Sequence, residues 1–86
     1  MNREEIYAVI KKHIQENLED VQESDIDPKK SMKDYGANSL DIIEVVSCSM
    51  RELNIKIPRS ELTNIKTIDE LVDKFLANSA AKPAGN

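Results

Sequence analysis

Ser39 is the side chain whose position in this sequence of 86 residues most clearly suggests chemistry. It lies in residues 34–41, DYGANSLD, where a long polar segment ends and the most apolar helical pattern of the chain begins. Gly36 can relax the backbone where the chain changes direction, and Asn38 and Ser39 are both favoured at helix starts. The pattern therefore predicts an exposed hydroxyl group at the first turn of a helix.

A catalytic role for Ser39 lacks the necessary partners. A nucleophilic serine needs a base within hydrogen-bond reach and a third group that orients this base. The single histidine, His13, falls midway along another predicted helix at the edge of its apolar face, and GxSxG does not occur. We therefore predict that the protein is not an enzyme and that Ser39 is an attachment point. From position alone, the alternative is that Ser39 or Asn38 only caps the helix.

No metal site is expected. The acidic residues between 16 and 27 could suggest a calcium loop, but an EF-hand needs glycine at position six and glutamate at position twelve. No frame of this segment supplies both, so we interpret it as a solvated run of charge. Cys48 has no flanking cations and is not expected to be a reactive thiol.

Composition restricts the partners and the compartment. The net charge of −4 and the pI of about 4.9 argue against nucleic acid, which requires a basic face. The lone Cys48 cannot form an internal disulfide, which fits a reducing compartment. No apolar run approaches membrane-spanning length, and the charged start is unlike a signal peptide. We expect a cytoplasmic monomer that binds neither membranes nor nucleic acid.

The periodicity of the apolar residues predicts an all-α fold. Glycine is rare, aromatic residues make up 3%, and aliphatic residues recur at helical spacing. We predict three longer helices and a short third one, at 3–18, 39–53, roughly 58–64 and 68–76. They would form a small four-helix bundle with a long first loop.

The remaining segments are a long connection and a tail. Residues 19–38 are too long for a structureless loop, so we expect a short turn there, held by apolar anchors. The candidate anchors are Val21, Ile26, Met32 and Tyr35. Residues 1–76 would form one domain, and the small and polar residues 77–86 a disordered C-terminal tail.

The second predicted helix has two different faces. At 100° per residue, its core face consists of Ile42, Val45, Val46, Ser49 and Leu53. The opposite face mixes charged residues with Leu40, and Ile43 and Met50 lie at its edge. A helix with only one packing partner does not need these apolar residues, so we predict a small binding patch formed by Leu40, Ile43 and Met50.

Residues 36–41, GANSLD, resemble the signature of acyl carrier proteins, whose usual form is Gly-x-Asp-Ser-Leu-[Asp/Glu]. The similarity covers roughly residues 4–76 and extends beyond this motif. It includes the long first loop, DIIEVV at 41–46, IKIP at 55–58 and TIDEL at 67–71. The order of four helices together with the motif is more specific than the motif alone.

The resemblance implies a carrier that delivers cargo between enzymes. Ser39 would bear 4′-phosphopantetheine through a phosphodiester, added from coenzyme A by a phosphopantetheinyl transferase. The thiol of this arm would hold acyl groups as thioesters for acyltransferases, ketosynthases or related biosynthetic enzymes. A helix start suits such an anion, because free N–H groups and the helix dipole favour negative charge. The expected partner-binding residues are Asn38, Leu40, Asp41, Ile43, Glu44, Met50 and Arg51.

The chain departs from the family pattern at a few positions. Asn38 replaces the usual aspartate, which removes one negative charge beside the transferase site. Met50, Arg51 and Arg59 interrupt the acidic surface that carriers of fatty-acid synthesis usually have. These departures favour a carrier of a polyketide-type or other specialised pathway, including the donor carriers of β-branching cassettes.

Other cargoes and another class of function remain open at this stage. The protein could carry intermediates of fatty-acid synthesis, or aminoacyl, peptidyl or D-alanyl groups, although Ala37 and Asn38 differ from the usual peptidyl-carrier form. Alternatively, it could be an unmodified helical interaction module that binds through the Leu40 patch.

Overall fold

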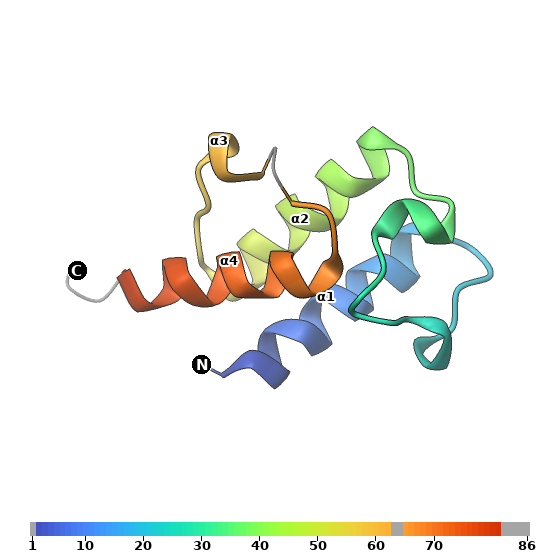
Figure 1. Cartoon of the computed structure of the whole chain (residues 1–86), viewed down its shortest axis with the longest axis horizontal. Helices are drawn as coiled ribbons and strands as arrows, with labels where there is room; N and C mark the ends of the chain where they lie inside the picture. Colours follow the sequence, from blue (N-terminus) through green and yellow to red (C-terminus); the bar gives the residue numbers. More distant parts are fainter. Residues whose placement is uncertain (1, 63–64, 82–86) are drawn as a thin grey trace.

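In the computed structural model, which describes residues 2–62 and 65–81, all regular elements are helices (Figure 1). They are α1 (Arg3–Asn17), the 3-10 helices η1 (Glu23–Asp25) and η2 (Met32–Tyr35), α2 (Ser39–Leu53), α3 (Arg59–Leu62) and α4 (Ile68–Ala81). The predicted all-α bundle, with a short third helix and a long first loop, is confirmed.

Helix α1 forms one wall of the core. Ile6, Ile10 and Ile14 recur every fourth residue and are fully buried, as the amphipathic pattern predicts. The Asn2 side chain accepts a hydrogen bond from the Glu5 amide at 2.9 Å, and Glu5 accepts one from the Asn2 amide at 3.0 Å. This reciprocal cap fixes where the helix starts.

Helix α2 places its predicted face in the core. Val45, Val46, Ser49 and Leu53 are buried, and Ile42 is half-buried. The Ser49 hydroxyl donates to the Val45 carbonyl at 2.8 Å, which satisfies this polar group inside the apolar interior. The predicted core face of α2 is therefore confirmed.

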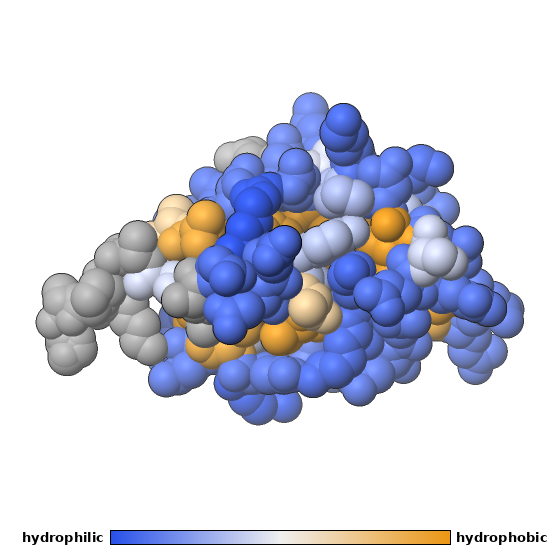
Figure 2. Space-filling model, turned by 90° about the horizontal axis from the view of Figure 1, so that it is seen from below, coloured by the Kyte–Doolittle hydropathy of each residue, from blue (hydrophilic) through white to orange (hydrophobic). Residues whose placement is uncertain are grey.

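Helices α1, α2 and α4 lie together, whereas α3 stands at one edge of the molecule (Figure 1). Helix α1 packs against both α2 and α4. The buried residues that α4 contributes are Ile68, Leu71, Val72 and Phe75. On the face drawn in Figure 2, hydrophilic residues cover most of the surface, and apolar residues show between them.

A group of polar side chains, here called the Glu52 clamp, ties α1 to α2. The Glu52 carboxylate lies 2.7 Å from Lys12 Nζ and 2.8 Å from His13 Nε2. The other ring nitrogen of His13 lies 3.1 Å from Glu16. The hydrogen bond from Lys12, followed by that from His13, lowers the pKa of Glu52. His13 is therefore a structural residue at the edge of the core.

The first loop is more ordered than a single turn, because it contains both η1 and η2. Of the four predicted anchors, Ile26 and Met32 are buried, while Val21 and Tyr35 are half-buried against the core. The Tyr35 hydroxyl also accepts a hydrogen bond from the Asp27 amide at 2.6 Å.

The loop is joined directly to the start of α4. The amide of Ile68 donates to the Lys30 carbonyl at 3.0 Å, and the amide of Asp69 donates to the Pro28 carbonyl at 2.8 Å. These bonds use two amides of the first turn of α4, which have no partner inside the helix. Thr67 and Glu70 form the predicted capping box, with bonds of 3.1 and 3.2 Å.

The predicted ends of the last two helices were partly wrong. Helix α4 continues to Ala81, so residues 77–81, predicted to belong to a disordered tail, are helical. The reason is that Leu76 packs against the core and the Asn78 side chain donates to the Lys74 carbonyl at 2.9 Å. Helix α3 starts at Arg59, one residue after the predicted start at about 58, and its described part extends to Leu62. The predicted residues 63–64 and 82–86 lie outside the described part of the chain.

Candidate attachment site and adjacent groove

The turn before α2 directs Ser39 outward. Gly36, at the end of η2, has a φ of 89°, in the left-handed region where a side chain is disfavoured. The following Ala37 is buried and fixes the chain against the core. Helix α2 begins two residues after this turn, at Ser39, whose side chain is exposed.

Asn38, and not Ser39, caps α2. The Asn38 side chain accepts a hydrogen bond from the Asp41 amide at 2.8 Å, and the Asp41 carboxylate accepts one from the Asn38 amide at 3.0 Å. Ser39 is the first helical residue, is exposed, and forms no side-chain hydrogen bond within the described residues. Its hydroxyl is therefore not needed to hold the helix.

Ser39 has no base beside it. His13 is held by Glu52, which follows Ser39 by 13 residues, or about 20 Å along the axis of α2. The positive end of α2 lies at the serine instead, with the amides of Ser39 and Leu40, which have no acceptor inside the helix, and this favours a bound anion. The geometry suits an attached phosphodiester better than nucleophilic catalysis.

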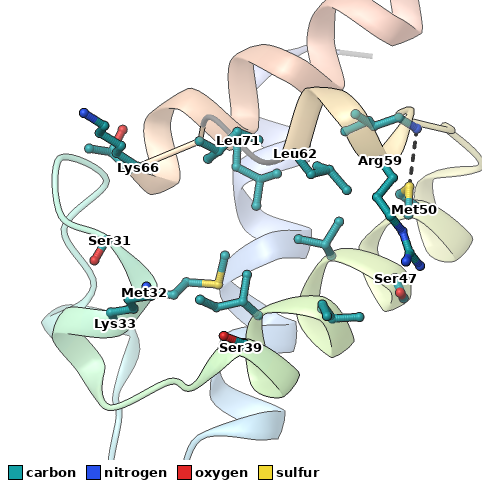
Figure 3. Close-up of a pocket in the computed structure, with 16 residues that line it drawn as sticks. Ser31, Met32, Lys33, Ser39, Ser47, Met50, Arg59, Leu62, Lys66 and Leu71 are labelled. Atoms are coloured by element: carbon teal, nitrogen blue, oxygen red, sulfur yellow. Dashed lines mark hydrogen bonds between the residues drawn. The ribbon is translucent and has the colours of Figure 1, made fainter.

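A groove of about 720 Å³ begins beside Ser39 and runs between α2, α3, η2 and the start of α4 (Figure 3). Its volume is in the range of small-molecule pockets. The apolar residues that line it are Met32, Ile42, Ile43, Val46, Met50, Ile57, Leu62, Ile65 and Leu71. The polar ones are Ser31, Lys33, Ser39, Ser47, Arg59, Lys66 and Thr67.

The outward surface of α2 combines apolar and charged residues. Leu40 and Ile43 are 75% and 54% exposed, which is unusual for large aliphatic side chains. Glu44 and Arg51 are exposed beside them, whereas Asp41 is half-buried and shares its charge with the cap of the helix. This surface and Ser39 belong to the same helix.

Met50 is not on this outward surface. It is half-buried against the core, lines the groove, and its Sδ accepts a hydrogen bond from the Ile57 amide at 3.4 Å. The predicted binding patch of Leu40, Ile43 and Met50 stays a prediction, and its members differ in exposure, because Leu40 and Ile43 are exposed and Met50 is half-buried. The helical period placed Met50 at the edge of the outward face of α2. The segment that follows α2 folds back over this edge, and its Ile57 amide contacts Met50.

Cys48 is a half-buried thiol that donates to Glu44 at 3.5 Å. Desolvation, together with this hydrogen bond, raises its pKa, which reduces the thiolate that a reactive cysteine needs. Elsewhere in the described residues, no three His, Cys, Asp or Glu side chains are grouped as metal ligands would be. Nor does any helix in residues 2–62 and 65–81 have the length and apolar character to span a bilayer.

Comparison with known proteins decides the family. Residues 8–75 match the family described as "Phosphopantetheine attachment site". The chain belongs to the acyl carrier protein family. It is 32% identical over 73 residues to "Polyketide biosynthesis acyl-carrier-protein AcpK" of Bacillus subtilis, a match that covers 85% of this chain and 89% of that protein. It is also 32% identical over 80 residues to "Acyl carrier protein" of Acidothermus cellulolyticus, covering 92% and 93%.

Membership in this family makes the chain a carrier and not a catalyst. Its cofactor is 4′-phosphopantetheine, held covalently on a serine, and its partners are biosynthetic enzymes and a phosphopantetheinyl transferase. An exposed, unbonded Ser39 at the start of α2 fits this group.

Sequence reasoning identified Ser39 but not the groove beside it. Lys33 and Lys66 are 33 residues apart in the chain, and nothing in the local pattern of either residue indicates a shared cavity. Both line the groove, because the start of α4 is bonded to the carbonyl groups of Pro28 and Lys30. No signal in a single sequence predicts this pairing.

Proposed function

We propose that Ser39 is the serine that carries 4′-phosphopantetheine. The observation that supports this most strongly is the division of roles at the start of α2, where Asn38 caps the helix and leaves the Ser39 hydroxyl exposed. A phosphodiester there would face the free first-turn amides of α2. The thiol of the bound arm supplies the site of acyl attachment as a thioester.

We further propose that α2 presents the surface that partner enzymes contact. Leu40 and Ile43 would supply an apolar contact, and Glu44 and Arg51 would fix its orientation by charge. Other members of the proposed surface are Asn38, Asp41 and, through the rim of the groove, Met50. The partners would be a phosphopantetheinyl transferase and acyltransferase, ketosynthase or related enzymes.

For the pathway, we favour polyketide or other specialised biosynthesis. The similarity to the Bacillus subtilis polyketide carrier supports this assignment. So do the cations Arg51 and Arg59, at positions where carriers of fatty-acid synthesis usually have acidic residues. A donor carrier of a β-branching cassette is one form of this proposal, and fatty-acid or aminoacyl cargo is the alternative. We propose that the protein is a monomer. We also propose a cytoplasmic location, since the lone Cys48 cannot form an internal disulfide.

Intact mass tests the attachment site. The protein is incubated with coenzyme A and a promiscuous phosphopantetheinyl transferase, and we expect the mass of one added arm. Ser39→Ala should abolish the addition, whereas Ser47→Ala, on the same helix and beside the same groove, should retain it. An arm that is still added to folded Ser39→Ala would place the attachment elsewhere.

A further inference from the structure

All charged side chains that line the groove are cationic. They are Lys33 in η2, Arg59 in α3 and Lys66 before α4, and no aspartate or glutamate lines the groove. The chain has 16 acidic residues against 12 lysines and arginines, so the groove has the opposite sign to the protein as a whole. Within residues 2–62 and 65–81, none of these three cations forms an ion pair.

Arg59 is the cation best placed to act inside the groove. Its side chain extends from α3 toward α2, on the side where Ser47 and Met50 lie (Figure 3). Ser47 follows Ser39 by eight residues, or about 12 Å along α2. The guanidinium group therefore lies on the Ser47 side of the groove, away from the attachment point.

The space between Ser39 and Arg59 is apolar. Val46 and Leu71 are buried at its floor, and Ile42 and Leu62 are half-buried along its walls. Such a lining favours a methylene chain, and an unpaired arginine at its end favours a carboxylate, which it can bind through two parallel hydrogen bonds.

We infer that the cargo suited to this groove is an ω-carboxyacyl group, an acyl chain that ends in a second carboxylate, with Arg59 as the residue that pairs with this carboxylate. The inference rests on the proposed attachment at Ser39. An acyl chain with a terminal methyl group would fill the apolar part and leave Arg59 unpaired. The groove thus selects cargo by charge at its far end.

The test compares two cargoes that differ only at this end. A promiscuous transferase loads the protein from adipoyl-coenzyme A, labelled with ¹³C at its free carboxyl, or from hexanoyl-coenzyme A of equal chain length. Intact mass of the wild type and of Ser39→Ala first verifies loading at Ser39, so a failure of the proposed attachment is seen before cargo recognition is measured. NMR then follows the titration of the labelled carboxyl group.

We expect the pKa of the adipoyl carboxyl to be lower by about one unit in the wild type than in Arg59→Gln, because an adjacent arginine favours the charged form. Lys56→Gln, which removes an exposed cation that does not line the groove, should behave as the wild type. Arg59→Lys should give an intermediate pKa. The shifts of the groove amide signals that the hexanoyl group causes, relative to the holo protein without cargo, should be the same in the wild type and in Arg59→Gln.

Two results would overturn the inference. One is an equal carboxyl pKa in the wild type and in folded Arg59→Gln. The other is that Arg59→Gln shifts the groove amide signals of the holo protein without cargo as much as it shifts those of the adipoyl carrier. That result would assign the guanidinium group to the phosphodiester of the arm.

Discussion

The two sides of α2 are built in different ways. Toward α1, α2 buries Val45 and Ser49 completely, and the Glu52 clamp adds hydrogen bonds at the far end of the helix. Toward α3, it borders a groove of about 720 Å³ whose walls include half-buried Ile42 and Leu62. One helix therefore contributes to a close-packed core and to an open binding surface.

This difference shows where the bundle can adapt. Helix α3, Arg59–Leu62 in the part of the chain that the structure describes, is far below the length at which a helix is stable by itself. It is held by neighbours, including Asn78 of α4, whose side chain donates a hydrogen bond to the Glu61 carboxylate of α3 at 3.3 Å. We therefore expect the α3 side to adapt more readily than the close-packed α1 side.

The largest effect is expected on the close-packed side. Phe75→Ala removes a fully buried ring and should lower the free energy of unfolding by about 3–5 kcal/mol. Leu62→Ala, at the half-buried wall of the groove, should cost about 1 kcal/mol. Urea denaturation measures both, and equal losses would show that the two sides are packed alike.

Met50→Glu should have the next largest effect. It places a carboxylate where the thioether packs against the core and accepts the Ile57 amide, at a cost of about 1–3 kcal/mol. Ile43→Glu, at an exposed position of the same helix, should change stability by about 0.5 kcal/mol or less. If the two variants were equally stable, Met50 would belong to the exposed surface after all.

The cap at the start of α2 should contribute less. Asn38→Ala removes the acceptor for the Asp41 amide and should cost about 1 kcal/mol. Ser39→Ala should leave the stability nearly unchanged, since its hydroxyl bonds to nothing in the described chain. Thermal unfolding of the two variants separates the cap from the attachment residue, and a loss of stability in Ser39→Ala would contradict this division.

The smallest effect is expected for the pH dependence of the Glu52 clamp. Since the pKa of Glu52 is lower in the folded state, Glu52 stabilises the fold above its unfolded pKa of about 4.3, and this contribution is lost as pH falls through the folded pKa. Glu52→Gln should therefore flatten the loss of stability below about pH 4.3. Unfolding curves between neutral and acidic pH test this. Glu19→Gln, on the exposed loop, serves as the control, and an equal flattening in both variants would exclude a specific role of the clamp.

Local patterns predicted the parts of the fold that local physics determines. The spacing of Ile6, Ile10 and Ile14 located α1, and the Thr67–Glu70 capping box located the start of α4. The end of α4 was missed because it depends on contacts of Leu76 and Asn78, which the sequence pattern does not reveal.

The candidate site was predictable only as far as it is local. The GANSLD motif identified Ser39, and the helical period placed Leu40 and Ile43 outside. The same period placed Met50 at the edge of the outward face of α2. Its partial burial depends on the segment around Ile57, whose amide donates to the Met50 sulfur. The cationic lining of the groove includes Lys33 and Lys66 from distant segments of the chain, which no single-sequence pattern encodes.

The bonds from the start of α4 to the carbonyl groups of Pro28 and Lys30 have a consequence for how this chain can vary in length. They divide the first loop into a segment before Pro28 and a segment between Lys30 and α2. Residues added before Pro28, near exposed Glu19 and Asp20, would lengthen a surface loop at a small entropic cost. Residues added after Lys30 would displace η2 and with it one wall of the groove. Insertions should therefore be tolerated in only the first half of this loop.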